Sequence, residues 1–202
     1  MLNDETGIIK TGLFGGAFDP VHNGHLTIAE SYLESGLIDE LWVMPTPNPP
    51  FKQERTSADF VHRYAMTVLA FTGIPKTNVS DFETKLDGVS YTLNTLRALR
   101  EQFPDRSWSL CIGEDNLSTF HKWYEYEKVL SMADLIVAER PGNIDNGQFG
   151  VYKDKIHRID HIPVDISSTE IRKELSVKGF SSQIPSNVME YIRANHLYDV
   201  RS

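Results

Sequence analysis

The chain has 202 residues, of which 40% are hydrophobic and 24% are charged, and this composition excludes a mainly disordered protein. Its 28 acidic and 20 basic side chains give a net charge of -8, which argues against a broad nucleic-acid-binding face. No stretch approaches the ~20 apolar residues of a membrane span, and the N-terminus is acidic where a secretory signal is basic. We therefore expect a cytoplasmic protein that binds neither nucleic acid nor a membrane; a homo-oligomer is left open.

The single cysteine supports the same location. Cys111 lies in the apolar run of residues 109–112, where a buried and inert thiol is expected rather than a nucleophile. One cysteine cannot form a disulfide within the chain. We infer a reducing compartment.

Short apolar runs alternate with segments of helical periodicity along the whole chain. This alternation implies right-handed crossovers between parallel strands. We therefore predict an α/β fold, an open doubly wound (Rossmann-like) and mostly parallel sheet with helices on both faces. The predicted strands are residues 8–14, 40–44, 79–83, 108–113, 135–139 and 156–164.

Amphipathic helices are predicted between these strands. The first begins near His22, and the second lies between Ser57, its candidate N-cap, and Gly73, its stop. Met66, Tyr64 and Val68 of the second helix are predicted to be core residues. The apolar stripes of the first three helices are Leu26, Ala29 and Leu33; then Val61, Tyr64, Ala65, Val68 and Leu69; and then Leu93, Leu96, Leu99 and Phe103.

The turn after the first strand carries the most informative motif. Residues 11–26 read Thr-Gly-Leu-Phe-Gly-Gly-Ala-Phe-Asp-Pro-Val-His-Asn-Gly-His-Leu. Gly15 and Gly16 allow the backbone to approach a ligand closely, and the amides before the helix form an anion site. The motif matches neither the phosphate loop of NTPases nor the dinucleotide fingerprint.

Two histidines lie at the start of the first predicted helix. His22 and His25 are three residues apart, so both project on one side and can donate hydrogen bonds to phosphate oxygens. One alternative is a buried capping histidine next to a solvated one. Another is a zinc or iron site formed by Asp19, His22 and His25, but the upstream glycine pair favours phosphate.

The pattern Gly-Gly-x-Phe-Asp-Pro-x-His-x-Gly-His resembles the signature of a nucleotidyltransferase superfamily that includes adenylyltransferases and cytidylyltransferases. This resemblance implies that the triphosphate of ATP is bound by His22, His25 and the backbone of Gly15, Gly16, Ala17 and Phe18.

A second motif lies near the C-terminus, where residues 165–172 read Asp-Ile-Ser-Ser-Thr-Glu-Ile-Arg. Ser167 and Glu170 predict a capping box that starts a helix. The purely structural interpretation of this motif is a well-capped helix with an exposed arginine. The pattern is similar to the second signature of the same superfamily. That similarity assigns Ser168, Thr169 and Arg172 to the ATP phosphates.

Several further segments resemble the bacterial nicotinate mononucleotide adenylyltransferases. This resemblance implies transfer of AMP from ATP to nicotinate mononucleotide in NAD biosynthesis, with Mg²⁺ accompanying ATP. It also implies one nucleotidyltransferase domain over residues 1–202, in which residues 166–202 form a C-terminal helical part that completes the ATP site. The resembling segments are residues 48–52, 87–96, 112–117 with Trp123, 140–142 and 184–198.

The same resemblance suggests where the mononucleotide binds. Amides near Tyr91 and Thr92 suit a small carboxylate, and Trp123 offers a face to a pyridine ring. The structural alternatives are that Tyr91 and Thr92 only cap a helix and that Trp123 is a core residue. Gly113 and Asp115 are assigned to ATP, where Asp115 accepts hydrogen bonds from ribose hydroxyls.

Lys52 follows a proline-rich stretch and is either a catalytic phosphate contact or a solvated side chain. Phe51 and Glu114 depart from the family pattern, which often has histidine and a small residue at these positions. The other histidines, His62, His121, His157, His161 and His196, receive no role.

Three functional alternatives accompany this interpretation. They are an adenylyltransferase that prefers nicotinamide mononucleotide, a metal-dependent phosphohydrolase using Asp19, His22 and His25, and a nucleotide-binding module without activity.

Overall fold

The computed structural model describes residues 7–49, 57–139, 146–162, 164 and 166–200. Its strands are β1 (Ile9–Gly16), β2 (Glu40–Pro45), β3 (Thr77–Val79), β4 (Arg106–Gly113), β5 (Asp134–Glu139) and β6 (Ile156–Asp160). Its α-helices are α1 (Asn23–Glu34), α2 (Phe60–Phe71), α3 (Thr92–Gln102), α4 (Glu114–Thr119), α5 (Tyr126–Met132), α6 (Ser168–Lys178) and α7 (Ser186–Ala194). Short 3-10 helices are η2 (Phe82–Lys85), η3 (Phe120–Lys122), η4 (Asn146–Lys155) and η5 (Leu197–Asp199).

The strands form one parallel sheet in the order β3-β2-β1-β4-β5-β6. The chain first moves from β1 toward β3 and then crosses back to β4, so the strand order reverses between β1 and β4. In such sheets ligands bind beyond the carboxyl ends of the strands at this reversal. The predicted doubly wound parallel fold is confirmed.

Two apolar clusters fill the space on the two faces of the sheet. Side chains of α1 and α2 pack in one cluster with Phe14 and Val43, and α6 and α7 extend this cluster. Side chains of α3, α4 and α5 pack in the other with Leu13 and Trp42. Neighbouring residues of one strand thus point into opposite clusters, as expected for a sheet buried on both faces.

The predicted position of the third strand is wrong. β3 ends at Val79, where the predicted strand began, and residues 82–85 form the 3-10 helix η2. Phe82 is buried, and its backbone N–H bonds the Ser80 hydroxyl. An apolar residue three positions after Val79 therefore continues the core without continuing the strand. The sixth strand is also shorter than predicted and ends at Asp160.

The apolar stripe predicted for α2 is displaced from its buried face. Val61 is 69% exposed and Val68 is 38% exposed, so assigning Val68 to the core was wrong. Met66 is fully buried, as predicted. The buried face consists of Arg63, Met66, Thr67, Ala70 and Phe71. Both faces of the helix carry apolar residues at helical spacing. The buried face also contains an arginine and a threonine, so its sequence pattern looks less apolar than that of the exposed face.

The cap of α2 also differs from the prediction. Its N-cap residue is Asp59 instead of Ser57, while the helix ends at Phe71, close to the predicted stop. The leucine stripe of α3 is confirmed, because Leu93, Leu96 and Leu99 are fully buried.

Cys111 is buried and free, and burial raises the pKa of its thiol. Such a thiol is a packing group rather than a nucleophile at neutral pH. No helix within the described part of the chain is long and apolar enough to cross a membrane.

Candidate active site

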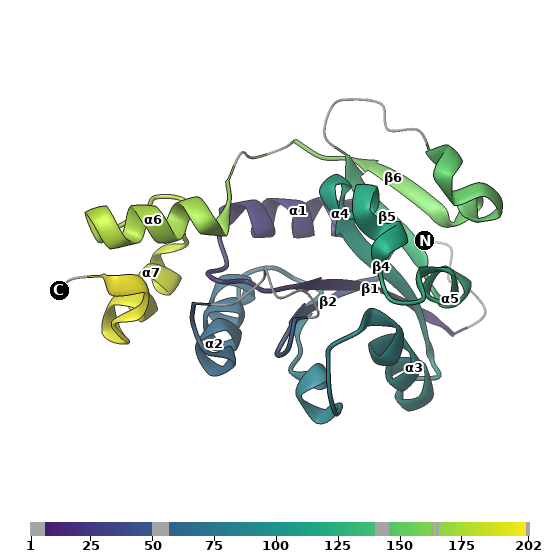
Figure 1. Cartoon of the computed structure of the whole chain (residues 1–202), viewed down its shortest axis with the longest axis horizontal. Coiled ribbons are helices and arrows are strands. Elements are labelled where there is room, and N and C mark those ends of the chain that lie inside the picture. Colours follow the sequence, from purple (N-terminus) through teal and green to yellow (C-terminus); the bar gives the residue numbers. More distant parts are fainter. Residues whose placement is uncertain (1–6, 50–56, 140–145, 163, 165, 201–202) are drawn as a thin grey trace.

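The two sequence motifs meet beyond the carboxyl end of β1. Figure 1 shows α6 and α7, in yellow-green and yellow, beside the start of α1. The backbone N–H of Asn23 donates to Gln183 O at 2.8 Å, which ties the start of α1 to the segment between α6 and α7. The C-terminal part therefore lies at the end of the sheet where a ligand is expected.

The turn between β1 and α1 is tightly packed. Phe18 has a φ of +48°, an uncommon value for a residue with a side chain, and is only 2% exposed. Its ring lies 5.4 Å from the Phe14 ring and 4.9 Å from the His25 ring. A Cβ at Gly16 would lie 3.2 Å from the Phe18 ring, so glycine fits this position best. Buried aromatic packing thus sets the path of the backbone that was predicted to bind phosphate.

His22 and His25 lie together at the start of α1, as predicted. His22 is the N-cap residue, and the two imidazole rings stack with their centroids 3.7 Å apart. A Cβ at Gly24 would lie 3.1 Å from Nδ1 of His22, so the glycine between the histidines leaves room for the ring. The Gly in His-x-Gly-His is therefore a packing requirement of the pair.

The hydrogen bonding of His25 defines which ring nitrogen can donate. Its Nδ1 accepts the backbone N–H of His22 at 3.1 Å, so in the neutral ring the proton lies on Nε2. Burial, reinforced by the neighbouring His22, holds the pKa of His25 well below its usual value. At neutral pH His25 is thus an uncharged ring that offers Nε2–H as a donor.

His22 is also neutral at physiological pH. Burial lowers its pKa to about 4, and only 6% of the residue is exposed. Its Nδ1 is buried and has no hydrogen-bond partner among the residues that the structure describes. An unsatisfied buried polar atom is costly, and a ligand that hydrogen-bonds it removes that cost.

The start of α6 matches the second motif. Ser167 is the N-cap, its hydroxyl accepts the Glu170 N–H at 3.2 Å, and it donates to the Glu170 carboxylate at 3.1 Å. The predicted cap is confirmed.

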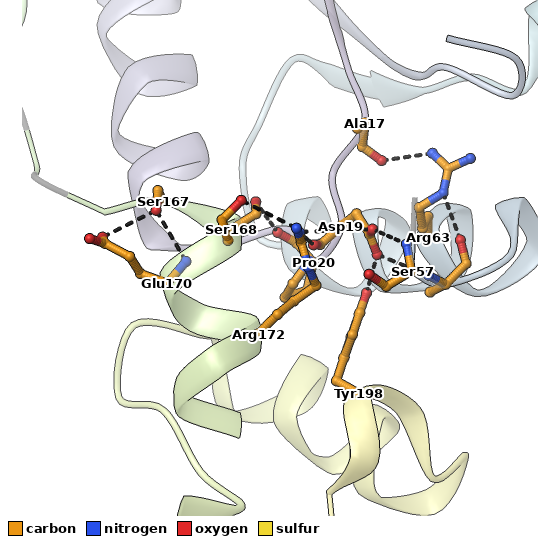
Figure 2. Close-up of polar contacts among 12 residues, drawn as sticks. Ala17, Asp19, Pro20, Ser57, Arg63, Ser167, Ser168, Glu170, Arg172 and Tyr198 are labelled. Atoms are coloured by element: carbon orange, nitrogen blue, oxygen red, sulfur yellow. Dashed lines mark hydrogen bonds and ion pairs between the residues drawn. The ribbon is translucent and has the colours of Figure 1, made fainter. Parts of the chain in front are cut away.

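Hydrogen bonds from α6 join the two motifs directly, as Figure 2 shows. The Ser168 hydroxyl donates to Pro20 O at 3.0 Å. Arg172 Nη1 donates to Asp19 O at 2.6 Å, and its Nη2 donates to Thr169 Oγ1 at 3.2 Å. The bonds to Pro20 and Asp19 span about 150 residues of sequence, so only the tertiary structure reveals this connection.

Asp19 has a role that sequence reasoning missed. Its carboxylate is 3% exposed and accepts hydrogen bonds from the backbone N–H groups of Ser57 and Ala58 and from the Tyr198 hydroxyl. In the part of the chain that is described, no group of three metal-ligating side chains could hold a metal ion. The carboxylate thus serves as a structural junction, and the metal site of Asp19, His22 and His25 is not formed.

Arg63 is a second missed residue. It is 1% exposed, and its Nη1 donates to Ala17 O at 2.7 Å and to Thr46 O at 3.0 Å, while its Nε donates to Ala58 O at 3.1 Å. One guanidinium therefore holds the β1–α1 turn, the end of β2 and the start of α2. The available signal was an arginine three positions before Met66, on one helical face with it.

The predicted mononucleotide residues lie around the start of α3. Tyr91 is its N-cap, and the Tyr91 ring lies 4.7 Å from that of Tyr124. Trp123 is partly buried, and its ring centroid lies 4.9 Å from that of Phe120. The ring therefore packs at the edge of the apolar core. Thr92 is the first residue of α3.

The loop before α3 is clamped from two sides. The backbone of Asn48 exchanges hydrogen bonds with Ser90, and its side chain donates to Gly88 O at 3.3 Å. On the other side, Thr95 donates to the carboxylate of Glu83 at 2.7 Å, and burial raises the pKa of that carboxylate. The sequence motif indicated the loop, but it did not indicate that Asn48 and Glu83 hold the loop in place.

Gly113 is the N-cap of α4 at the end of β4, and Asp115 lies exposed in the first turn. Glu114, one of the departures from the family pattern, is buried with its carboxylate 3.9 Å from Arg158. The predicted residues Lys52 and Phe51 and the segment 140–142 lie outside the described residues.

Comparisons with known proteins show which proteins this chain is similar to. A family model described as cytidylyltransferase-like matches residues 13–174. A probable nicotinate-nucleotide adenylyltransferase of Flavobacterium johnsoniae is 39% identical over 195 residues, which cover 94% of this chain and 99% of that protein. The nicotinate-nucleotide adenylyltransferase of Bacillus subtilis is 34% identical over 193 residues, with coverages of 94% and 98%.

Solved structures show the same fold. The nicotinic acid mononucleotide adenylyltransferase of Plasmodium falciparum, solved in complexes with APC and with NaAD, has a TM-score of 0.78 at 22% identity. The match covers 96% of this chain and 98% of that chain.

Proposed function

Because this chain belongs to the cytidylyltransferase-like family and, within it, to the nicotinate-nucleotide adenylyltransferases, we propose how its residues divide the work of that reaction. The enzyme transfers AMP from ATP to nicotinate mononucleotide, giving nicotinate adenine dinucleotide and pyrophosphate in NAD biosynthesis. The observation that carries our assignment is the pair of bonds by which Ser168 and Arg172 join the turn that precedes His22 and His25.

The chemical step needs no nucleophilic side chain. A phosphate oxygen of the mononucleotide attacks the α-phosphorus of ATP and forms a new P–O bond. The bond between the α-phosphorus and the bridging oxygen breaks, and its electron pair leaves with pyrophosphate. Both reactants are anions, so the enzyme acts by holding them in line and by stabilising negative charge.

The ATP phosphates lie, in this proposal, between the starts of α1 and α6. His22 and His25 donate hydrogen bonds from neutral rings. Arg172 supplies the positive charge. The β1–α1 backbone and the hydroxyls of Ser168 and Thr169 add donors, and Lys52 is proposed as a further phosphate contact.

Mg²⁺ is proposed to enter bound to ATP, as part of that substrate. The mononucleotide is proposed to place its ring carboxylate near Tyr91 and Thr92 at the start of α3 and its ring near Trp123. The Thr92 N–H is the proposed donor there, because the Tyr91 N–H already donates to Val89 O at 2.8 Å. Gly113 and Asp115 are proposed to contact the ATP ribose. A cytoplasmic location stays a prediction.

Pyrophosphate release, coupled to a colorimetric phosphatase assay, tests the function. With ATP and Mg²⁺, nicotinate mononucleotide should support turnover, whereas phosphopantetheine and choline phosphate should not. Release of phosphate from ATP without any acceptor would instead favour a phosphohydrolase. Absence of pyrophosphate release with every mononucleotide would leave only a nucleotide-binding module.

A further inference from the structure

The buried carboxylate of Asp19 joins three distant parts of the chain. It accepts the Ser57 N–H at 2.5 Å, the Ala58 N–H at 3.2 Å and the Tyr198 hydroxyl at 2.7 Å. The two amides precede α2, whereas Tyr198 lies 179 residues further along the chain than Asp19. A buried carboxylate requires such donors because water no longer solvates it.

Arg172 approaches the same residue from a different side. Its Nη1 donates to the main-chain carbonyl of Asp19 at 2.6 Å, but lies 3.9 Å from the nearer carboxylate oxygen. The carboxylate therefore faces Ser57 and Tyr198, as Figure 2 shows, and it also accepts the Ala58 N–H. Its contact with the guanidinium is an ion pair at 3.9 Å without a hydrogen bond. Arginine has five N–H donors, and this arrangement leaves some of them for another anion.

The C-terminal turn is shaped to present the Tyr198 hydroxyl. His196, Tyr198 and Asp199 have φ values of +50°, +58° and +56°, which are uncommon for residues with side chains. The Tyr198 side chain packs against the cluster shared by α1, α2, α6 and α7. Burial and the neighbouring Asp19 raise the pKa of Tyr198, so its hydroxyl remains a donor at physiological pH.

We propose that Tyr198 is a positioning residue for ATP, whose hydrogen bond to Asp19 keeps that carboxylate at ion-pair distance from Arg172 and prevents a direct hydrogen bond between them. This inference rests on the proposed role of Arg172 at the ATP phosphates. Without the hydroxyl, one carboxylate oxygen retains only the Ala58 N–H at 3.2 Å. That oxygen is Oδ1, whereas the oxygen 3.9 Å from Arg172 Nη1 is Oδ2, which accepts the Ser57 N–H. With Oδ1 held by one long bond, the carboxylate turns more freely, and Oδ2 can then move into hydrogen-bond contact with the guanidinium and compete with ATP for it.

The test compares two single-atom deletions in the C-terminal part. Tyr198→Phe removes the hydroxyl that bonds Asp19. Tyr191→Phe is the matched control, because it removes a hydroxyl whose hydrogen-bond partner is His62 of α2, at 3.0 Å, and not Asp19. ATP binding is measured by calorimetry without mononucleotide, and KM values for both substrates are measured on the same samples.

Tyr198→Phe should raise the Kd and KM for ATP by about tenfold, the scale of one hydrogen bond to a charged group, and change the mononucleotide KM less than about twofold. Tyr191→Phe should leave both substrates near wild type. In an Arg172→Ala background, Tyr198→Phe should have little further effect on ATP binding. The guanidinium for which the Asp19 carboxylate and ATP would compete is then absent.

An equal ATP affinity in the two tyrosine variants would overturn the inference, as would an unchanged Tyr198→Phe effect in the Arg172→Ala background. A parallel rise of both KM values together with a lowered Tm would reduce Tyr198 to a structural residue. If wild type turns over normally in these cases, only this inference fails. If wild type binds no ATP, the proposed function fails first.

Discussion

His25 combines an oriented donor with a neutral charge state. Its Nδ1 is occupied by the His22 N–H, and burial together with His22 keeps its pKa low. In the proposed site, Nε2–H is therefore a donor whose tautomer is fixed before ATP binds. A donor of this kind contributes to the rate because no reorganisation is needed when charge develops.

The first prediction follows for His25→Ala. This variant should keep its fold and lose about 10²-fold or more in kcat/KM, the scale for losing a preorganised donor. Circular dichroism and kinetics on the same sample measure both quantities. His157→Ala is a suitable control, because His157 lies on β6 and bonds Asp134 at the other end of the sheet. Turnover near wild type in a folded His25→Ala protein would make His25 structural.

Arg172 provides the second prediction. Its two terminal nitrogens serve different acceptors, Asp19 O and Thr169 Oγ1, and a lysine ammonium cannot reproduce that geometry. Arg172→Lys should lose measurable activity and Arg172→Ala more, with ATP affinity affected more than mononucleotide affinity. The control is Lys173→Ala, which removes the neighbouring exposed charge of α6. A larger effect on the mononucleotide would move this helix start to the other substrate's site.

At the scale of elements, the start of α3 has the properties of an anion site. No acidic residue lies in its first turn and the Tyr91 side chain makes no capping bond, so no side chain compensates the helix dipole there. The Tyr91 N–H already donates to Val89 O at 2.8 Å, which leaves the first amides of the helix itself for an anion. Asn48 holds the preceding loop in place. Burial raises the pKa of the nearby Glu83 carboxylate.

The third prediction concerns the preferred mononucleotide. Nicotinate carries a ring carboxylate, and the amide of nicotinamide offers these N–H groups a poorer acceptor. The kcat/KM for nicotinate mononucleotide should exceed that for nicotinamide mononucleotide by at least roughly tenfold, which is about 1.4 kcal/mol. Both are measured at equal ATP and Mg²⁺. Equal values would contradict this selectivity but not adenylyl transfer.

The elements also show why periodicity is an incomplete guide. In α2, two apolar stripes compete, and the buried one contains Arg63 and Thr67. Arg63 is buried because three backbone carbonyls from different loops surround it. In β3, the core residue Phe82 follows the strand on a 3-10 turn. Both errors arise because burial depends on the neighbouring elements, which a local pattern does not contain.

At the scale of the whole molecule, the buried histidines link folding to pH. The pKa of His22 is about 4 in the folded protein and near 6.5 when unfolded, so the unfolded state binds more protons between these values. Stability is therefore fully present above pH 6.5 and decreases as the pH falls toward 4. His25 acts in the same direction.

The fourth prediction is the size of this effect. His22→Gln should remove up to about 3 kcal/mol of the decrease in unfolding free energy between pH 7 and pH 4, from the shift in pKa. Urea unfolding at several pH values measures it. His121→Gln, a change at an exposed histidine, should leave the slope as in wild type. A slope equal to wild type in His22→Gln would show that other groups dominate the acid response.

The sequence by itself determined the family, the parallel α/β fold and the position of the two motifs that are proposed to bind phosphate. These follow from local patterns: glycines and histidines at a strand-to-helix turn, a serine cap with an arginine one turn later, and alternating strands and helices. Only the tertiary structure decided that Ser168 and Arg172 bond the turn before His22, and that Asp19, Arg63 and Tyr198 support it. The physical reason is that these contacts join residues far apart in the chain, and a buried charge gains its partners only when the elements pack.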